Sequence, residues 1–177
     1  GSQVIFTTTP RLIGATLKAA VEHPEIRFLN CSLTFAHPSI RTYYGRMYEA
    51  KFLTGAIAGA LTENGKIVYI ADYPIYGMGA NINAFALGAK MVNPRAKVYL
   101  EWSTVEGRDV QRAFQEKGIS IISNQDMVRS PNPSRQFGLC HVDGDKLTSL
   151  ALPVWQWGIF YERIVRSILD GSWKSEA

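Results

Sequence analysis

The chain has 177 residues, of which 46% are hydrophobic and 19% are charged, a balance typical of a folded globular protein rather than a disordered one. No apolar run reaches the ~18–20 residues that a helix needs to cross a bilayer. The net charge is +4, but the basic residues are scattered along the chain, which argues against nucleic-acid binding.

The first third of the chain shows strand and helix patterns in alternation. Apolar residues recur at intervals of three and four over residues 12–21 and again over residues 41–61, which predicts two helices. Short apolar runs predict strands at residues 4–7 and 26–31, and a polar link without periodicity covers residues 32–40. Gly55 and Gly59 in the long helix predict close contact between that helix and a sheet.

The rest of the chain continues the alternation. The predicted strands cover residues 67–71, 98–102, 119–123, 137–142 and 150–154. The predicted helices cover residues 79–92, 109–117 and 157–169, and a proline-containing loop covers residues 126–136. Such alternation with short turns predicts an α/β fold with a mainly parallel sheet and helices on both faces.

A glycine turn, Gly77-Met78-Gly79, follows the strand at residues 67–71 and suggests a dinucleotide-binding loop. That fingerprint is G-x-G-x-x-G directly after a strand, with an acidic residue about 20 positions later. Glu101 supplies the acid, but the third glycine position is Ile82 and five residues separate the strand from the turn. The segment could also be a plain loop that binds no ligand. The poor match to the fingerprint favours a loop that contacts a ligand other than a dinucleotide.

No arrangement of residues indicates catalysis or a metal site. The sequence has no G-x-S-x-G nucleophile motif, and Asp143 and Asp145 flank Gly144 as in a simple turn. Cys31 and Cys140 lie far apart at the ends of apolar runs, which predicts buried free thiols. We therefore expect no enzyme activity and no cofactor.

Four ordered motifs give the chain a family resemblance. Its segments RMYEA, INAF, VNP and WQWG occur at residues 46–50, 82–85, 92–94 and 155–158. In this order and spacing they resemble the basic membrane protein (BMP) family, the substrate-binding lipoproteins of ABC importers that include purine-nucleoside-binding members. The resemblance covers about residues 4–174.

The resemblance implies a type I periplasmic-binding-protein fold, in which two α/β lobes enclose a ligand. It implies that this chain is about one half of such a protein. Residues 1–36 would be the strand–helix–strand remnant of the first lobe, and residues 37–177 would form the second lobe, a three-layer α/β unit with a parallel sheet.

Ligands of open α/β sheets bind at the carboxyl ends of the strands. Polar and aromatic residues follow several predicted strands, which favours a neutral, hydroxyl-rich or heterocyclic ligand over a phosphate. With the resemblance, the expected ligand-binding residues are Tyr73, Pro74, Tyr76, Asn124, Gln125, Asp126, Asp143 and Trp157. Asp126 would accept hydrogen bonds from ribose hydroxyls or else cap a turn, and Trp157 would stack on a base or else belong to the core.

Two departures from the family pattern fall on the cleft side. Residues 103–107 replace an aromatic and aspartate run, and the proline loop at residues 127–136 replaces a helix. Both changes predict a loss of nucleoside specificity or, as the alternative, a truncated chain that binds no ligand.

The resulting functional hypothesis is a non-catalytic solute-binding component of an ABC importer that binds a purine nucleoside or a related small polar ligand. The resemblance implies an ABC permease as partner and an extracytoplasmic, membrane-anchored lipoprotein as the full-length form. A cytoplasmic ligand-sensing domain of a BMP-like regulatory protein is the alternative, and an NAD-type oxidoreductase domain comes third. We also expect this chain to self-associate as a homodimer through exposed apolar surface.

Overall fold

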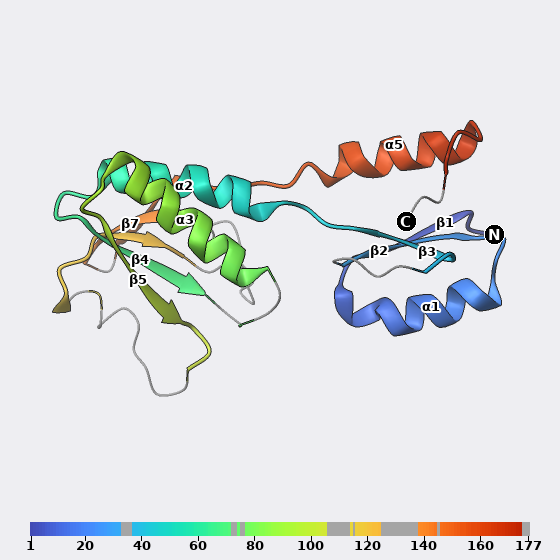
Figure 1. Cartoon of the computed structure of the whole chain (residues 1–177), viewed down its shortest axis with the longest axis horizontal. Coiled ribbons are helices and arrows are strands. Elements are labelled where there is room, and N and C mark those ends of the chain that lie inside the picture. The colour runs from blue at the N-terminus through green and yellow to red at the C-terminus, as the bar shows by residue number, and fades with distance from the viewer. Residues whose placement is uncertain are drawn as a thin grey trace. The chain divides into compact units, whose positions relative to one another are not determined.

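The computed structural model describes residues 1–32, 37–71, 74, 77–105, 114, 116–124, 138–144 and 146–174. The chain forms two compact units, one made of residues 1–45 with 155–177 and the other of residues 46–154 (Figure 1). The family resemblance had led us to expect a division after residue 36. The two divisions differ because residues 40–43 and the last helix pack with the first unit.

The first unit is a three-layer α/β sandwich. Its parallel sheet has the order β1 (Val4–Thr7), β2 (Arg27–Cys31) and β3 (Ile40–Tyr43). A short 3-10 helix, η1 (Pro10–Leu12), leads into α1 (Ile13–Glu22), which covers one face, and α5 (Trp157–Leu169) covers the other (Figure 1). The sheet is therefore buried on both faces, as parallel sheets usually are.

Residues 41–46 were predicted to begin the long helix, and this prediction was wrong. Residues Ile40–Tyr43 form a strand that pairs in parallel with β2, and the helix α2 (Met47–Leu61) begins only at Met47. Thr42 and Tyr43 have side chains that favour strands, and pairing with β2 satisfies their backbone groups.

The second unit contains a five-stranded mixed sheet in the order β5-β4-β6-β7-β8. The strands are β4 (Lys66–Ala71), β5 (Lys97–Trp102), β6 (Ile121–Ser123), β7 (Leu139–Asp143) and β8 (Lys146–Ala151). Strands β5, β4 and β6 are parallel, as predicted, whereas β7 and β8 run antiparallel to their neighbours. The prediction of a mainly parallel sheet therefore holds for β1, β2 and β3 and for β5, β4 and β6. Strand β7 departs from it by pairing antiparallel with β6, and the turn at Gly144 then folds β7 and β8 into a hairpin.

Helices α2 and α3 (Met78–Val92) lie together over one face of this sheet (Figure 1). Their backbones approach closely through three glycines. A side chain at Gly55 would collide with the Phe85 carbonyl, one at Gly59 with Ala89, and one at Gly88 with Phe52. The glycines of α2 therefore allow contact with a second helix and not, as expected from the sequence, with the sheet.

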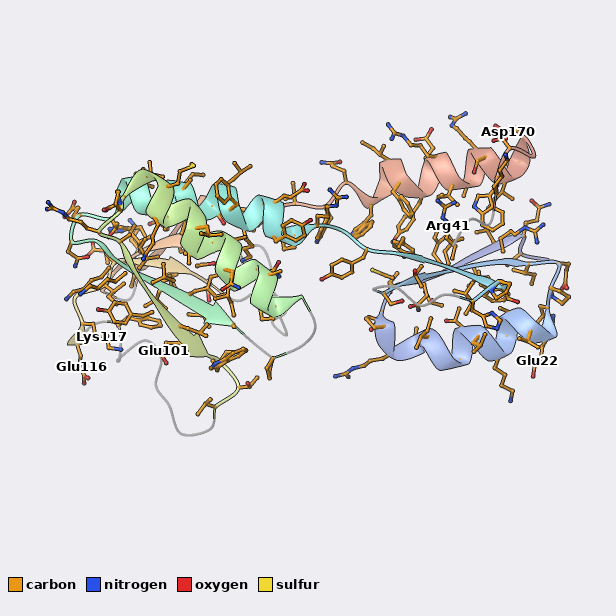
Figure 2. The ribbon with its side chains drawn as sticks, in the orientation of Figure 1. Glu22, Arg41, Glu101, Glu116, Lys117 and Asp170 are labelled. Atoms are coloured by element: carbon orange, nitrogen blue, oxygen red, sulfur yellow. The ribbon has the colours of Figure 1, made fainter. Side chains whose placement is uncertain are left out.

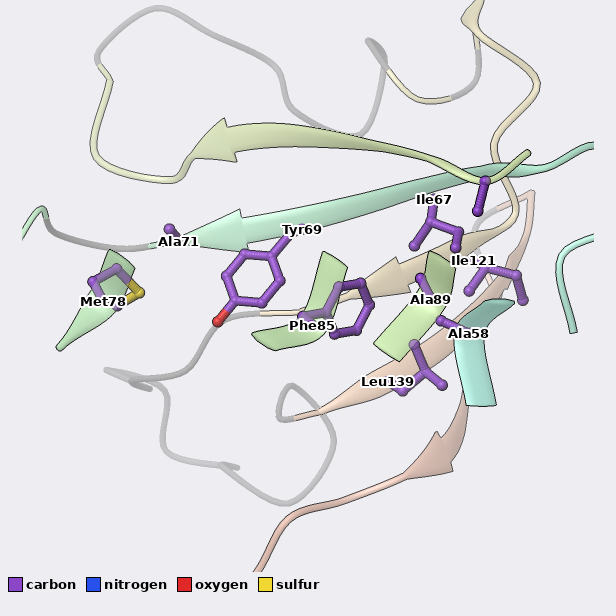
Figure 3. Close-up of a cluster of buried hydrophobic side chains, with 10 residues drawn as sticks. Ala58, Ile67, Tyr69, Ala71, Met78, Phe85, Ala89, Ile121 and Leu139 are labelled. Atoms are coloured by element: carbon purple, nitrogen blue, oxygen red, sulfur yellow. The ribbon is translucent and has the colours of Figure 1, made fainter. Parts of the chain in front are cut away.

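Beneath the two helices lies the main hydrophobic core of this unit (Figure 3). The Tyr69 ring of β4 packs edge-on against Phe85 of α3, with ring centroids 5.2 Å apart. The opposite face of the sheet carries a second cluster in which Phe114 packs with residues of β4 and β6. The predicted helix at residues 109–117 and the predicted loop at residues 126–136 fall largely outside the described residues.

Both cysteines are free thiols, as predicted. Cys140 is fully buried in β7, and Cys31 is half-buried at the end of β2. Burial raises the pKa of each thiol, so both are held in the neutral, weakly reactive form.

Candidate ligand-binding edge of the second sheet

The carboxyl ends of β4, β5 and β6 meet at one edge of the second sheet, because these three strands are parallel. The chain leaves β5 through Ser103, whose backbone N–H donates to the Ala71 carbonyl at 2.9 Å. It leaves β6 through Asn124, whose N–H donates to the Gly138 carbonyl at 2.7 Å. The edge is therefore well defined by backbone hydrogen bonds up to the points where the chain departs.

Six of the predicted ligand-binding residues follow β4 or β6 directly in sequence. Pro74 is exposed and Asn124 is half-buried. Tyr73, Tyr76, Gln125 and Asp126 lie outside the described residues. The segments start from neighbouring parallel strands, so the strand ends from which they start lie at one edge of the sheet.

Asp143 belongs to the opposite edge. It is the last residue of β7, which runs antiparallel to β6. His141 pairs with Ile121, the first residue of β6, so Asp143 lies beyond the start of β6 and away from its carboxyl end. Asp143 pairs with Lys146 next to Gly144, which has a left-handed φ of 56°. Asp143 thus flanks a hairpin turn, which matches its interpretation as a turn residue. It lies apart from Asn124.

Trp157 lies in the first unit and not in the second. It is the first residue of α5 and is half-buried in an aromatic cluster. Its ring stacks on Trp155 at 5.0 Å and meets Tyr43 edge-on at 5.5 Å. These contacts match the interpretation of Trp157 as a packing residue of its own unit.

The residues of the dinucleotide hypothesis have other roles in the structure. Gly77 is the N-cap of α3 with a left-handed φ of 88°, a conformation that favours glycine whether or not a ligand is present. Glu101 is 3% exposed, and its carboxylate lies 3.7 Å from the ammonium group of Lys117 (Figure 2). Both observations favour a structural use of these residues.

A buried lysine at the same edge was missed by the sequence analysis. Lys51 of α2 is 1% exposed, and its Nζ atom lies 3.4 Å from Ser123 Oγ and 5.1 Å from the centre of the Tyr69 ring. The sequence contained a signal, since Lys51 falls within an otherwise apolar or small stretch of the helix, residues 50–61. A lysine in such a stretch more often lies on the solvent-facing side of the helix, so the burial of Lys51 could be recognised only from the structure.

Among the described residues, no group of three or more histidine, cysteine or acidic side chains is arranged to hold a metal ion. Within the same ranges, no helix is both long and apolar enough to cross a membrane.

A model of the family described as ABC transporter substrate-binding protein PnrA-like matches residues 1–105 of this chain. A protein of Haloferax volcanii described as an ABC transporter glucose-binding protein is 30% identical over 98% of this chain and 48% of its own length. A purine-binding protein of Brucella abortus is 28% identical over 99% of this chain and 54% of its own length. The chain thus spans about half the length of these curated relatives.

A solved structure shows a related fold. The transcriptional activator of the comK gene from Bacillus halodurans superposes with a TM-score of 0.55 at 18% identity. The match covers 67% of this chain and 41% of that protein. At this identity the similarity concerns the fold alone.

Proposed function

This chain belongs to the PnrA-like family of ABC transporter substrate-binding proteins, and on that premise we propose that it binds a purine nucleoside or a related small polar solute for an ABC importer. The family match over residues 1–105 carries the proposal. The Brucella abortus relative, whose name specifies purine binding, supports the choice of ligand class. In this role the chain binds its ligand without catalysing a reaction.

The proposed ligand contacts follow β4 and β6: Tyr73, Pro74, Tyr76, Asn124, Gln125 and Asp126. Aromatic rings suit the flat face of a purine, and the Asp126 carboxylate suits the two neighbouring hydroxyls of a ribose. We leave Asp143 out because β7 carries it to the opposite edge of the sheet. We leave Trp157 out because its ring is engaged in the aromatic cluster of the first unit.

The family membership also motivates a proposal about partners and location. A substrate-binding protein of an importer delivers its ligand to a permease outside the cytoplasm. We propose that the full-length protein is extracytoplasmic, is anchored to the cell membrane as a lipoprotein, and docks on an ABC permease.

A ligand panel tests the proposed function. We expect adenosine, guanosine or inosine to raise the unfolding temperature, measured by thermal shift and confirmed by calorimetric titration. Glucose and NAD complete the panel, because a glucose-binding protein is among the relatives and NAD tests the oxidoreductase hypothesis. Stabilisation by NAD or glucose alone would refute the nucleoside proposal.

Two matched variants locate the site. Asp126→Asn is expected to weaken nucleoside binding roughly tenfold or more, because a carboxylate is a stronger acceptor than an amide. Asp143→Asn is the control, since it changes the same chemical group at the opposite edge of the sheet and should leave affinity unchanged. Equal effects of the two variants would contradict the proposed site.

The outer face of α2 and α3 supports the proposed homodimer. Leu53 and Leu87 are each 63% exposed and Met91 is 64% exposed, and Leu53 and Leu87 line a shallow hollow of about 400 Å³. An apolar face formed by one helix pair can be covered by the same face of a second copy about a twofold axis.

We expect light scattering to show a dimer in solution. The double variant Leu53→Glu with Leu87→Glu is expected to be monomeric, because it places charges in the apolar face. Leu169→Glu, which alters a similarly exposed leucine of α5 (69% exposed), serves as the control and should leave the dimer intact. A wild-type chain that stays monomeric at high concentration would refute the dimer.

A further inference from the structure

Lys51 sits at an unusual place for a lysine. Fully buried lysines are rare because removing an ammonium group from water costs several kcal/mol unless other groups compensate. The side chain of Lys51 is 1% exposed, on the face of α2 that is otherwise lined by Thr54, Gly55 and Ala58. A methionine of similar length would fill the same volume without this cost, so packing alone does not explain the lysine.

The position of its ammonium group is specific. Tyr69 of β4 and Ser123 of β6 are direct partners in the parallel ladder, and theirs is the last pair before β6 ends. Lys51 Nζ lies over the Tyr69 ring at 5.1 Å and donates to Ser123 Oγ at 3.4 Å. One charged group thus joins the two strands at their final shared position.

Both proposed ligand-binding segments begin close to this pair. The chain leaves β6 at Asn124, one residue after Ser123, and leaves β4 after Ala71, two residues beyond Tyr69. The end of β4 is held on its other side by β5, through the pairing of Ala71 with Trp102. The Lys51 contacts lie on the last pair that joins β4 to β6, next to both points where the chain leaves the sheet.

We propose that Lys51 is a positioning residue for the ligand-binding edge, holding the ends of β4 and β6 in the geometry that binding requires. In this proposal it acts through its contacts with Tyr69 and Ser123. The effect on affinity rests on the proposed function, whereas the effect on the strand ends does not.

A residue at the other end of the same helix provides a matched control. Thr62, at the C-cap of α2, is 9% exposed and donates from Oγ1 to the carbonyl of Lys66, the first residue of β4, at 3.0 Å. Thr62 therefore ties α2 to the start of β4, as Lys51 ties it to the end. Thr62→Val removes a buried polar contact away from the ligand-binding edge.

The test compares Lys51→Met, Ser123→Ala and Thr62→Val with the unmodified chain by hydrogen exchange without ligand. We expect Lys51→Met to speed exchange at the ends of β4 and β6, around residues 70–71 and 123–124, and to leave the centre of α3 unchanged. Ser123→Ala should give the same pattern to a smaller extent and remains informative if Lys51→Met fails to fold. Two results for Lys51→Met would overturn the proposal: faster exchange throughout the second unit, or no increase in exchange at the ends of β4 and β6.

Titration with the nucleoside that binds the unmodified chain most tightly gives the second reading. We expect Lys51→Met to weaken binding by up to roughly tenfold, because losing one charged hydrogen bond lowers the fraction of chains whose strand ends have the binding geometry. Thr62→Val should leave binding unchanged. Unchanged affinity in Lys51→Met would overturn the link to binding. If the unmodified chain binds no nucleoside, the proposed function fails and the exchange data still decide the role of Lys51.

Discussion

Gly55→Ala is expected to destabilise the second unit by about 3 kcal/mol or more, the upper range for forcing extra volume into a packed interface. The added Cβ would overlap the carbonyl oxygen of Phe85, which belongs to the backbone of α3 and cannot rotate away. The two helices would have to separate, and the core beneath them, including Ala58 and Phe85, would lose contacts. Chemical denaturation monitored by circular dichroism measures the change.

Gly79→Ala is the matched control for that substitution. Gly79 lies in the first turn of α3, is exposed, and has no atom within 4 Å of where its Cβ would be. Alanine there should stabilise the chain by about 0.5–1 kcal/mol, because alanine loses less backbone conformational entropy than glycine when the helix forms. If the two glycine variants behaved alike, close packing of α2 on α3 would be the wrong explanation.

Tyr43→Ala is expected to cost the first unit about 3–5 kcal/mol, the range for truncating a buried aromatic side chain. Tyr43 is 8% exposed, and its ring stacks on Phe160 of α5 at a centroid distance of 4.9 Å. Its hydroxyl lies 3.1 Å from that of Tyr161, and burial, reinforced by this hydrogen bond, raises the pKa of the Tyr43 phenol. Faster hydrogen exchange in α5 would report the loss directly.

Tyr43→Phe separates the ring from its hydroxyl. This variant keeps the stacking and loses one hydrogen bond, so we expect a cost of about 1 kcal/mol. A Tyr43→Ala variant that was no less stable than Tyr43→Phe would contradict the packing of β3 and α5 as parts of one unit.

The sequence predicted well those features that depend on near neighbours along the chain. The apolar run before Asp72 became β4, and the spacing of apolar residues between Trp157 and Leu169 became α5. The turn at Gly144 was also predicted, and this glycine has a positive φ of 56°. Four family motifs were sufficient to identify the family, which the match over residues 1–105 then confirmed.

Features that depend on distant partners were predicted less well. Residues 40–43 carry a pattern compatible with either helix or strand, and pairing with β2 decides for the strand. The direction of β7 is also set by pairing, and it decides that Asp143 and Asn124 lie at opposite edges of the sheet.

The sequence by itself therefore determined the family, the alternation of strands and helices, and the strands whose ends form the candidate site. Only the tertiary structure decided which strands pair, which unit each helix joins, and that Lys51 lies buried between Tyr69 and Ser123. The physical reason is that periodicity reports which face of an element is apolar, whereas partner, direction and depth arise from contacts between residues far apart in the chain.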